Sequence, residues 1–481
     1  MRATLLLTLM FSAAIASAQL PVNIDVVVTD ANGKRVTGLT ANDFEIREGG
    51  KPRPIAEFAE YRPDADVDVD GESRPPRTVV VLIERSSMDD EQVKTLYGAI
   101  RRLLRETITG PDDRAAVIGW SGGAIIRQPF SGSIEVLESA LDRMEREHEA
   151  VRRDRAAEAA VRDMAAAQAD AASEKIAASM TPVNDLDLAT HQLARVRRKV
   201  PALEALLNSM ATIEGRKILV LGLHRRGLMD DIAGMESVTT VRRRAINATL
   251  HHPVIHAANA SDVVIYPILP QGGARSAPRN PSVDDPAVSG GPGQSDNLVE
   301  VLEELSKKTG GLMAWGSTAI AAMLPHAAED VQSYYSLGFA APASGKDATR
   351  AIEVRAKNRR HRVRARAQLV EKSDKTAIRE QLVANLYHGL GAVAVPVEIT
   401  VSERTGGRVQ VRVTAEGNAR PLSFYVVAGS TVGVASEVLA RTQTLPVADF
   451  TLEVDASADQ ISAGVVDEGT KEIGLKRVPL P

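Results

Sequence analysis

The chain has 481 residues, a net charge of −4 and no cysteine, with 44% hydrophobic, 25% charged and 3% aromatic residues. The lack of cysteine excludes disulfides, zinc–thiolate sites, iron–sulfur clusters and thiol nucleophiles, while the weak negative charge and scarce aromatics disfavour nucleic acid as a partner. A chain of this length exceeds a single core, and its globular composition predicts about three domains.

The first 18 residues are predicted to be a signal peptide. Arg2 precedes an apolar stretch from Leu5 to Ile15, and Ala16-Ser17-Ala18 follows directly before Gln19. This pattern indicates a secretory signal over 1–18, cleaved after Ala18. The alternative, a membrane anchor, is disfavoured because the apolar stretch is shorter than the ~20 residues that a span needs. We therefore expect a secreted or periplasmic protein with no integral membrane span after cleavage.

Residues 19–62 are predicted to form a small N-terminal β unit. The stretch from Val22 to Val28 alternates and then becomes apolar, and Asn32-Gly33 is a hairpin signal. Residues 63–76 are rich in Asp, Pro and Gly, which indicates a linker. Alternate positions from Asp64 to Asp70 are acidic, but the glycine and the bidentate glutamate of a calcium loop are missing. A solvated linker is therefore the preferred interpretation.

The main domain is predicted over 77–370. Residues 77–84 run apolar without alternation, and a helical pattern follows from Asp90 to Glu106. Two more apolar strands are predicted at Lys217–Gly222 and Asp262–Leu269. Unbroken apolar strands are typical of a parallel sheet covered by helices on both faces, which predicts a doubly wound, mostly parallel α/β fold. Ligands bind at the carboxyl ends of such strands, so the loop after Glu84 is the candidate site.

A helical insertion is predicted over 134–212. From Val151 to Ser179 the sequence is rich in Ala, Arg and Asp and has few large apolar residues. A helix of that composition cannot be fully buried. Two interpretations remain open: the helix binds a partner through its alanines, or it is solvated.

The last third of the chain begins with a basic segment, Arg350 to Arg366. Val354 and Ala356, then Val363 and Ala365, alternate with charged residues. This pattern predicts a hairpin with one solvated face, in preference to a polyanion-binding patch. A linker helix is expected over 371–394. Short alternating strands over 395–481 predict a C-terminal β-sandwich.

Several stretches resemble the von Willebrand factor A-related proteins of the Acidobacteria type. They are Asn23–Gly49, Ala257–Ile268, Leu305–Gly311 and Asp330–Phe339, and the resemblance covers about residues 20–370. It implies a secreted A-type domain, which is a doubly wound, Rossmann-like sheet that usually binds a protein ligand through a divalent cation. No common enzymatic activity is implied.

The metal site implied by this resemblance is degenerate. The motif Asp-x-Ser-x-Ser stands here as Glu84-Arg85-Ser86-Ser87-Met88, and Gly222-Leu223-His224 stands where a later Asp is expected. Magnesium requires a nearly ideal shell of oxygen ligands, and two of them are missing. We interpret Glu84, Ser86 and Ser87 as a degenerate ligand-binding loop and expect no Mg²⁺, Mn²⁺ or Ca²⁺ cofactor. In the alternative interpretation, the two serines only cap the following helix.

The preferred function is a non-catalytic binding or scaffold protein, with an extracytoplasmic protein as its partner and no nucleic acid. One alternative is an extracytoplasmic hydrolase that uses His251, His252 and His256. The last two are four residues apart, as metal ligands on a helix are, but Pro253 stands where a metalloprotease has its glutamate. The other alternative is a metal-dependent adhesion protein. No catalytic residue is predicted.

Overall fold

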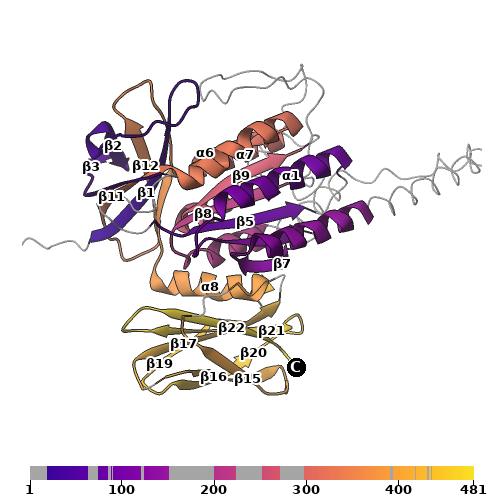
Figure 1. Cartoon of the computed structure of the whole chain (residues 1–481). Helices are drawn as coiled ribbons and strands as arrows, with labels where there is room; N and C mark the ends of the chain where they lie inside the picture. The colour runs from indigo at the N-terminus through magenta and orange to yellow at the C-terminus, as the bar shows by residue number, and fades with distance from the viewer. Residues whose placement is uncertain are drawn as a thin grey trace, which may run out of the picture.

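The computed structural model describes most of the chain. The described residues are 19–62, 74–84, 88, 90–120, 124–150, 200–223, 252–270, 297–390, 394–417, 419–430, 433–434 and 436–481. The predicted signal peptide, most of the linker and most of the helical insertion therefore lie outside them. Figure 1 shows a β unit beside a helix-covered sheet, with a second β domain below α8.

Six strands form the central sheet, in the order β10-β9-β8-β5-β6-β7. They are β5 (Arg77–Glu84), β6 (Arg114–Trp120), β7 (Ala124–Ser131), β8 (Arg216–Gly222), β9 (Val263–Leu269) and β10 (Ala314–Trp315). Neighbours pair in parallel except β7, which is antiparallel to β6. The predicted α/β fold with a mostly parallel sheet is therefore confirmed.

Helices cover both faces of this sheet. The helical segment 134–150, α1 (Asp90–Thr107) and α7 (Ser317–Gln332) pack on the face that contains Val79 and Val81. The helical segments 200–209 and 252–260 and α6 (Asn297–Thr309) pack on the face with Val80 and Leu82. Because successive strand residues point to opposite faces, the apolar side chains of β5 contribute to the hydrophobic cores on both faces of the sheet. None of the described helices is long and apolar enough to cross a membrane.

The N-terminal strands pair with strands from the far end of the predicted main domain. One sheet has the order β13-β1-β11-β4 and the other β14-β12-β2-β3. The strands are β1 (Gln19–Thr29), β2 (Phe44–Glu48), β3 (Lys51–Arg53), β4 (Glu57–Tyr61), β11 (Tyr334–Pro342), β12 (Ala348–Ala356), β13 (Arg362–Arg364) and β14 (Gln368–Glu371), with a short 3₁₀ helix, η1 (Ala41–Asp43), before β2. The structure therefore differs from the expected division, because residues 19–62 and 334–371 form one β unit.

The physical reason is that β1 needs partners on both edges. Eight of its residues pair with β11, from Gln19 with Pro342 to Val26 with Tyr335, and its last three pair with β13. A short isolated hairpin is only marginally stable in water. The predicted hairpin over 350–366 is also wrong, because β12 pairs with β2 and β14 whereas β13 pairs with β1.

The expected linker helix is a buried spacer, α8 (Asp374–His388). Ile378, Leu382 and Leu386 pack with residues of the C-terminal domain, while Ala384 and Tyr387 belong to a core of the central sheet. In Figure 1, α8 lies between these two parts. Its apolar residues occupy more than one face because it is covered on two sides.

The C-terminal domain consists of two antiparallel sheets that share one core. The first contains β15 (Val397–Val401), β16 (Arg408–Ala415) and β20 (Val447–Glu453). The second contains β17 (Leu422–Ser430), β18 (Gly433–Val434), β19 (Leu439–Gln443), β21 (Gln460–Asp467) and β22 (Ile473–Pro479). Alternate residues of β16 are buried, as expected for a sheet with one solvated face.

Candidate functional sites

The predicted ligand loop begins where β5 ends, at the carboxyl edge of the central sheet. Glu84 pairs with Trp120 at the end of β6 and is only 4% exposed. Arg85, Ser86 and Ser87 lie outside the described residues. Of the three predicted loop residues, the structure therefore places Glu84 alone.

Met88 stands at the last position of the implied metal motif, and it is part of the core. Its side chain is 1% exposed and lies in the same hydrophobic cluster as Val93 and Leu96 of α1. Methionine fills irregular apolar space well, and its thioether is a soft ligand that does not suit magnesium. This position therefore contributes packing and no hard oxygen ligand.

The end of β8 has no carboxylate where the resemblance implies one, and a side chain at Gly222 would be crowded. A Cβ atom on Gly222 would lie 3.1 Å from Cδ2 of Leu96. The next residue, Leu223, is 1% exposed, packs in the opposite core and donates its N–H to the carbonyl oxygen of Ile268 at 2.9 Å. Neither Gly222 nor Leu223 supplies an oxygen ligand from its side chain.

The histidine cluster is only partly described. His252 and His256 lie on the helical segment 252–260, whereas His251 lies outside the described residues. Burial and the nearby charge of Lys372 lower the pKa of His256. Within the described ranges, no three His, Asp or Glu side chains form a group that could hold a metal ion.

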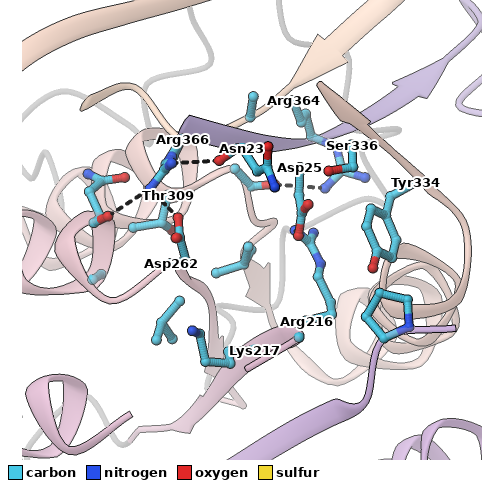
Figure 2. A pocket seen from close by; sticks show the side chains of 18 of the residues that line it. Asn23, Asp25, Arg216, Lys217, Asp262, Thr309, Tyr334, Ser336, Arg364 and Arg366 are labelled. Atoms are coloured by element: carbon cyan, nitrogen blue, oxygen red, sulfur yellow. Dashed lines mark hydrogen bonds and ion pairs between the residues drawn. The ribbon is translucent and has the colours of Figure 1, made fainter. Parts of the chain in front are cut away.

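A second candidate site lies at the opposite, amino-terminal edge of the sheet (Figure 2). A cavity of about 280 Å³ lies between the starts of β8 and β9 and residues of β1 and β11. Its charged lining residues are Asp25, Arg216, Lys217, Asp262, Arg364 and Arg366. The cavity thus lies where the β unit meets the central sheet.

One wall of the cavity is built around Arg216, which is 4% exposed. Its Nη1 atom donates to Oδ2 of Asp25 at 2.7 Å, and its guanidinium lies 5.0 Å from the ring centroid of Tyr334. Burial alone would lower the pKa of Arg216, but Asp25 raises it above the ordinary value. Arg216 therefore stays charged and joins β8 to β1 and β11.

The other wall combines a paired arginine with a lysine that has no carboxylate partner among the described residues. Arg366 pairs with Asp262 and donates to the carbonyl oxygen of Asn259 at 3.1 Å. Lys217 donates from Nζ to the carbonyl oxygen of Ile213 at 2.7 Å, and no ion pair of Lys217 is found within the described ranges. Burial lowers the pKa of Lys217.

Asp330 pairs with the lining residue Arg364 in a buried ionic network. Arg364 donates to both of its carboxylate oxygens, at 2.6 and 2.7 Å, and Arg35 donates to Oδ1. The hydroxyl of Tyr266 donates to Oδ2 at 2.7 Å. Burial by itself would raise the pKa of Asp330, but Arg364 and then Arg35 lower it well below its usual range. The network joins α7, β9, β13 and the segment after β1.

Sequence reasoning missed this second site, and it described Arg364 and Arg366 wrongly as part of a solvated face. Their side chains are 15% and 12% exposed. The available signal was a pair of cations, Arg216 and Lys217, at the start of an otherwise apolar strand. Charged residues at such a position need partners from elsewhere in the chain, and sequence spacing does not identify them.

Comparisons with known proteins leave the family unassigned. No family model matches this chain, and no curated protein matches it. The solved structures that are similar to it include von Willebrand factor A proteins. The vWF domain of the type V pili tip protein Mfa5 from Porphyromonas gingivalis is 16% identical, with a TM-score of 0.14, over 15% of this chain and 27% of that one.

Two further structures match over longer stretches. An aerotolerance-related membrane protein from Bacteroides fragilis is 10% identical, with a TM-score of 0.25, over 53% of this chain and 98% of that one. A von Willebrand factor type A protein from Catenulispora acidiphila is 10% identical, with a TM-score of 0.25, over 89% of this chain and 73% of that one. TM-scores this low carry no argument, so the fold assignment rests on the strand order and pairing described above.

Proposed function

We propose that this chain is an extracytoplasmic, non-catalytic binding or scaffold protein. In this proposal an A-type sheet binds a protein partner without a divalent ion. The observation that carries it is the packing at the carboxyl edge, where Met88 is buried in the core and a side chain on Gly222 would crowd Leu96. Export is supported by the signal-like pattern of residues 1–18.

The way the parts are joined supports a scaffold role. Asp330 ties the β unit to α7 and β9, and α8 is buried against both the central sheet and the C-terminal domain. Rigid attachment fixes the relative positions of surfaces that a partner contacts, which reduces the ordering cost of binding.

Affinity capture tests this function. The chain from Gln19 onward, immobilised without its predicted signal, should capture the same extracytoplasmic proteins in chelator and in magnesium, with amounts that agree within about twofold. The Glu84→Gln variant keeps the size of the side chain and removes its charge, so it should capture the same proteins. Partners that appear only with magnesium, and only with Glu84 intact, would favour the adhesion alternative. The absence of any captured partner would contradict protein binding itself.

A further inference from the structure

The cavity at the amino edge of the sheet differs from the proposed protein-binding edge in position and chemistry. It lies at the starts of β8 and β9, whereas Glu84 lies at the end of β5. Small-molecule sites occur preferentially at domain interfaces, and this cavity lies between the β unit and the central sheet. Its volume of about 280 Å³ suits a ligand of a few heavy atoms.

Among the described residues, the charges around the cavity leave one cation, Lys217, without an ion-pair partner. Arg216 has Asp25, Arg366 has Asp262 and Arg364 has Asp330. Lys217 is 6% exposed, and in the described part of the chain its ammonium meets only the carbonyl oxygen of Ile213. An ammonium can donate three hydrogen bonds, and a buried charge is stable only when it is paired or well hydrogen-bonded.

Other lining groups add hydrogen-bond donors that have no partner among the described residues. Asn259 lines the cavity and is 1% exposed, yet its amide nitrogen and oxygen lack hydrogen-bond partners among the described residues. The Nε atoms of Arg216 and Arg366 are likewise buried without a partner in that part of the chain. Buried polar groups are satisfied by protein, water or ligand in almost all native structures. The surplus here consists mainly of donors, which an acceptor-rich ligand satisfies.

We propose that this cavity binds a carboxylate group, with the ammonium of Lys217 as its counter-ion. A single negative charge matches Lys217, the one lining cation that has no ion-pair partner in the described part of the chain. A dianion such as phosphate fits less well, because Asp25 and Asp262 also line the cavity and would repel the second charge. The carboxylate belongs either to a free small acid or to the C-terminal residue of a peptide, and the two sources share the same recognition chemistry.

Ligand-observed NMR on the full chain tests the proposal with propionate as the first probe. Propionate should bind saturably, and propionamide, which has a similar shape and no charge, should not bind. In the Lys217→Met variant, which keeps the apolar stem, the Kd for propionate should rise at least about tenfold. Lys471→Met removes an exposed lysine from the C-terminal domain and should leave the Kd unchanged within about twofold.

A second variant and a second probe complete the test. Asn259→Asp places another negative charge at the cavity and should also weaken propionate binding at least about tenfold. This variant tests the proposal if Lys217→Met does not fold. Trialanine with a free carboxyl end, compared with its amide, distinguishes a peptide terminus from a free acid. If neither propionate nor free trialanine binds saturably, or if both variants bind as the unaltered chain does, the cavity holds only water and the proposal is wrong.

Discussion

Replacing Asp330 with Asn is expected to lower the free energy of unfolding by about 3–5 kcal/mol. The carboxylate is 0% exposed and accepts hydrogen bonds from Arg364, Arg35 and Tyr266. An asparagine of the same size loses the charge and points an N–H group toward these donors. Arg364 then remains buried without its anion, and Arg35 keeps, among the described residues, only Glu329, whose carboxylate lies 3.8 Å from its Nε atom. Since 1 kcal/mol shifts the Tm of a large domain by about 2–4 °C, the fall should be of the order of 10 °C.

A matched control separates this effect from the loss of any surface ion pair. Asp449 pairs with Arg412 at 2.7 Å in the C-terminal domain, and both side chains are 62% exposed. Asp449→Asn should leave the Tm unchanged, because solvent screens the pair. An Asp330→Asn variant as stable as this control would show that the buried network does not hold the β unit to the central sheet.

The same network predicts the direction of acid destabilisation. The pKa of Asp330 is lower in the folded protein than in the unfolded chain, where it is about 3.9. Its stabilising contribution is therefore complete above that pH and is lost as the pH falls below it. Asp330→Asn should remove this part of the acid dependence.

The folded protein is expected to lose stability as the pH falls from 7 to 4.5, because the pKa of His388 is lower in the folded protein than in the unfolded chain. It is 3% exposed at the end of α8, and its Nε2 atom lies 2.7 Å from the carbonyl oxygen of Ala202. Because a carbonyl only accepts, Nε2 carries the proton, and Nδ1 has no hydrogen-bond partner in the described part of the chain. Burial lowers the pKa of His388 from 6.5 to about 4, with a smaller contribution from Arg477.

The sign of the effect follows from which state binds the proton. Between pH 6.5 and pH 4 the unfolded chain takes up a proton that the folded protein excludes, so folding loses stability as the pH falls. With these two pKa values, the loss between pH 7 and pH 4.5 is about 2–3 kcal/mol. Urea unfolding at both pH values, with His388→Gln beside the unaltered chain, measures it.

Glutamine keeps an N–H donor at position 388 but does not titrate, so its variant should lose less stability over this pH interval. His326→Gln is the matched control, because the side chain of His326 is 48% exposed on α7. Equal pH dependence in the His388→Gln variant and the unaltered chain would mean that His388 titrates normally and that the contact between α8 and Ala202 is open to water.

Local patterns in the sequence predict the strands of the central sheet but not how the strands of the β unit pair. β5, β8 and β9 are unbroken apolar runs, and burial on both faces follows directly from that pattern. The alternation in β1 predicts a strand, yet its partner β11 lies more than 300 residues later in the chain. Strand pairing over such a separation depends on the whole fold, which a local pattern does not contain.

The candidate sites show the same limit. The substitutions at Glu84 and Met88 are visible in the sequence, because the resemblance supplies a motif to compare them with. The burial of Met88 and the close approach of Leu96 to Gly222 are visible only in the structure. Alternation over 350–366 predicts a solvated face, and this local pattern does not contain Asp330, the carboxylate partner of Arg364, which lies 34 residues away on another element.

Calorimetric titration with Mg²⁺, Mn²⁺ and Ca²⁺ tests the central claim, that the carboxyl edge of the sheet works without a divalent ion. Glu84 is one methylene longer than the usual Asp, and Met88 offers no oxygen. We expect no site tighter than about millimolar, and an ion present near its Kd should add less than about 0.5 kcal/mol to stability. A micromolar site that Glu84→Ala abolishes would contradict this account and make metal-dependent adhesion the leading function.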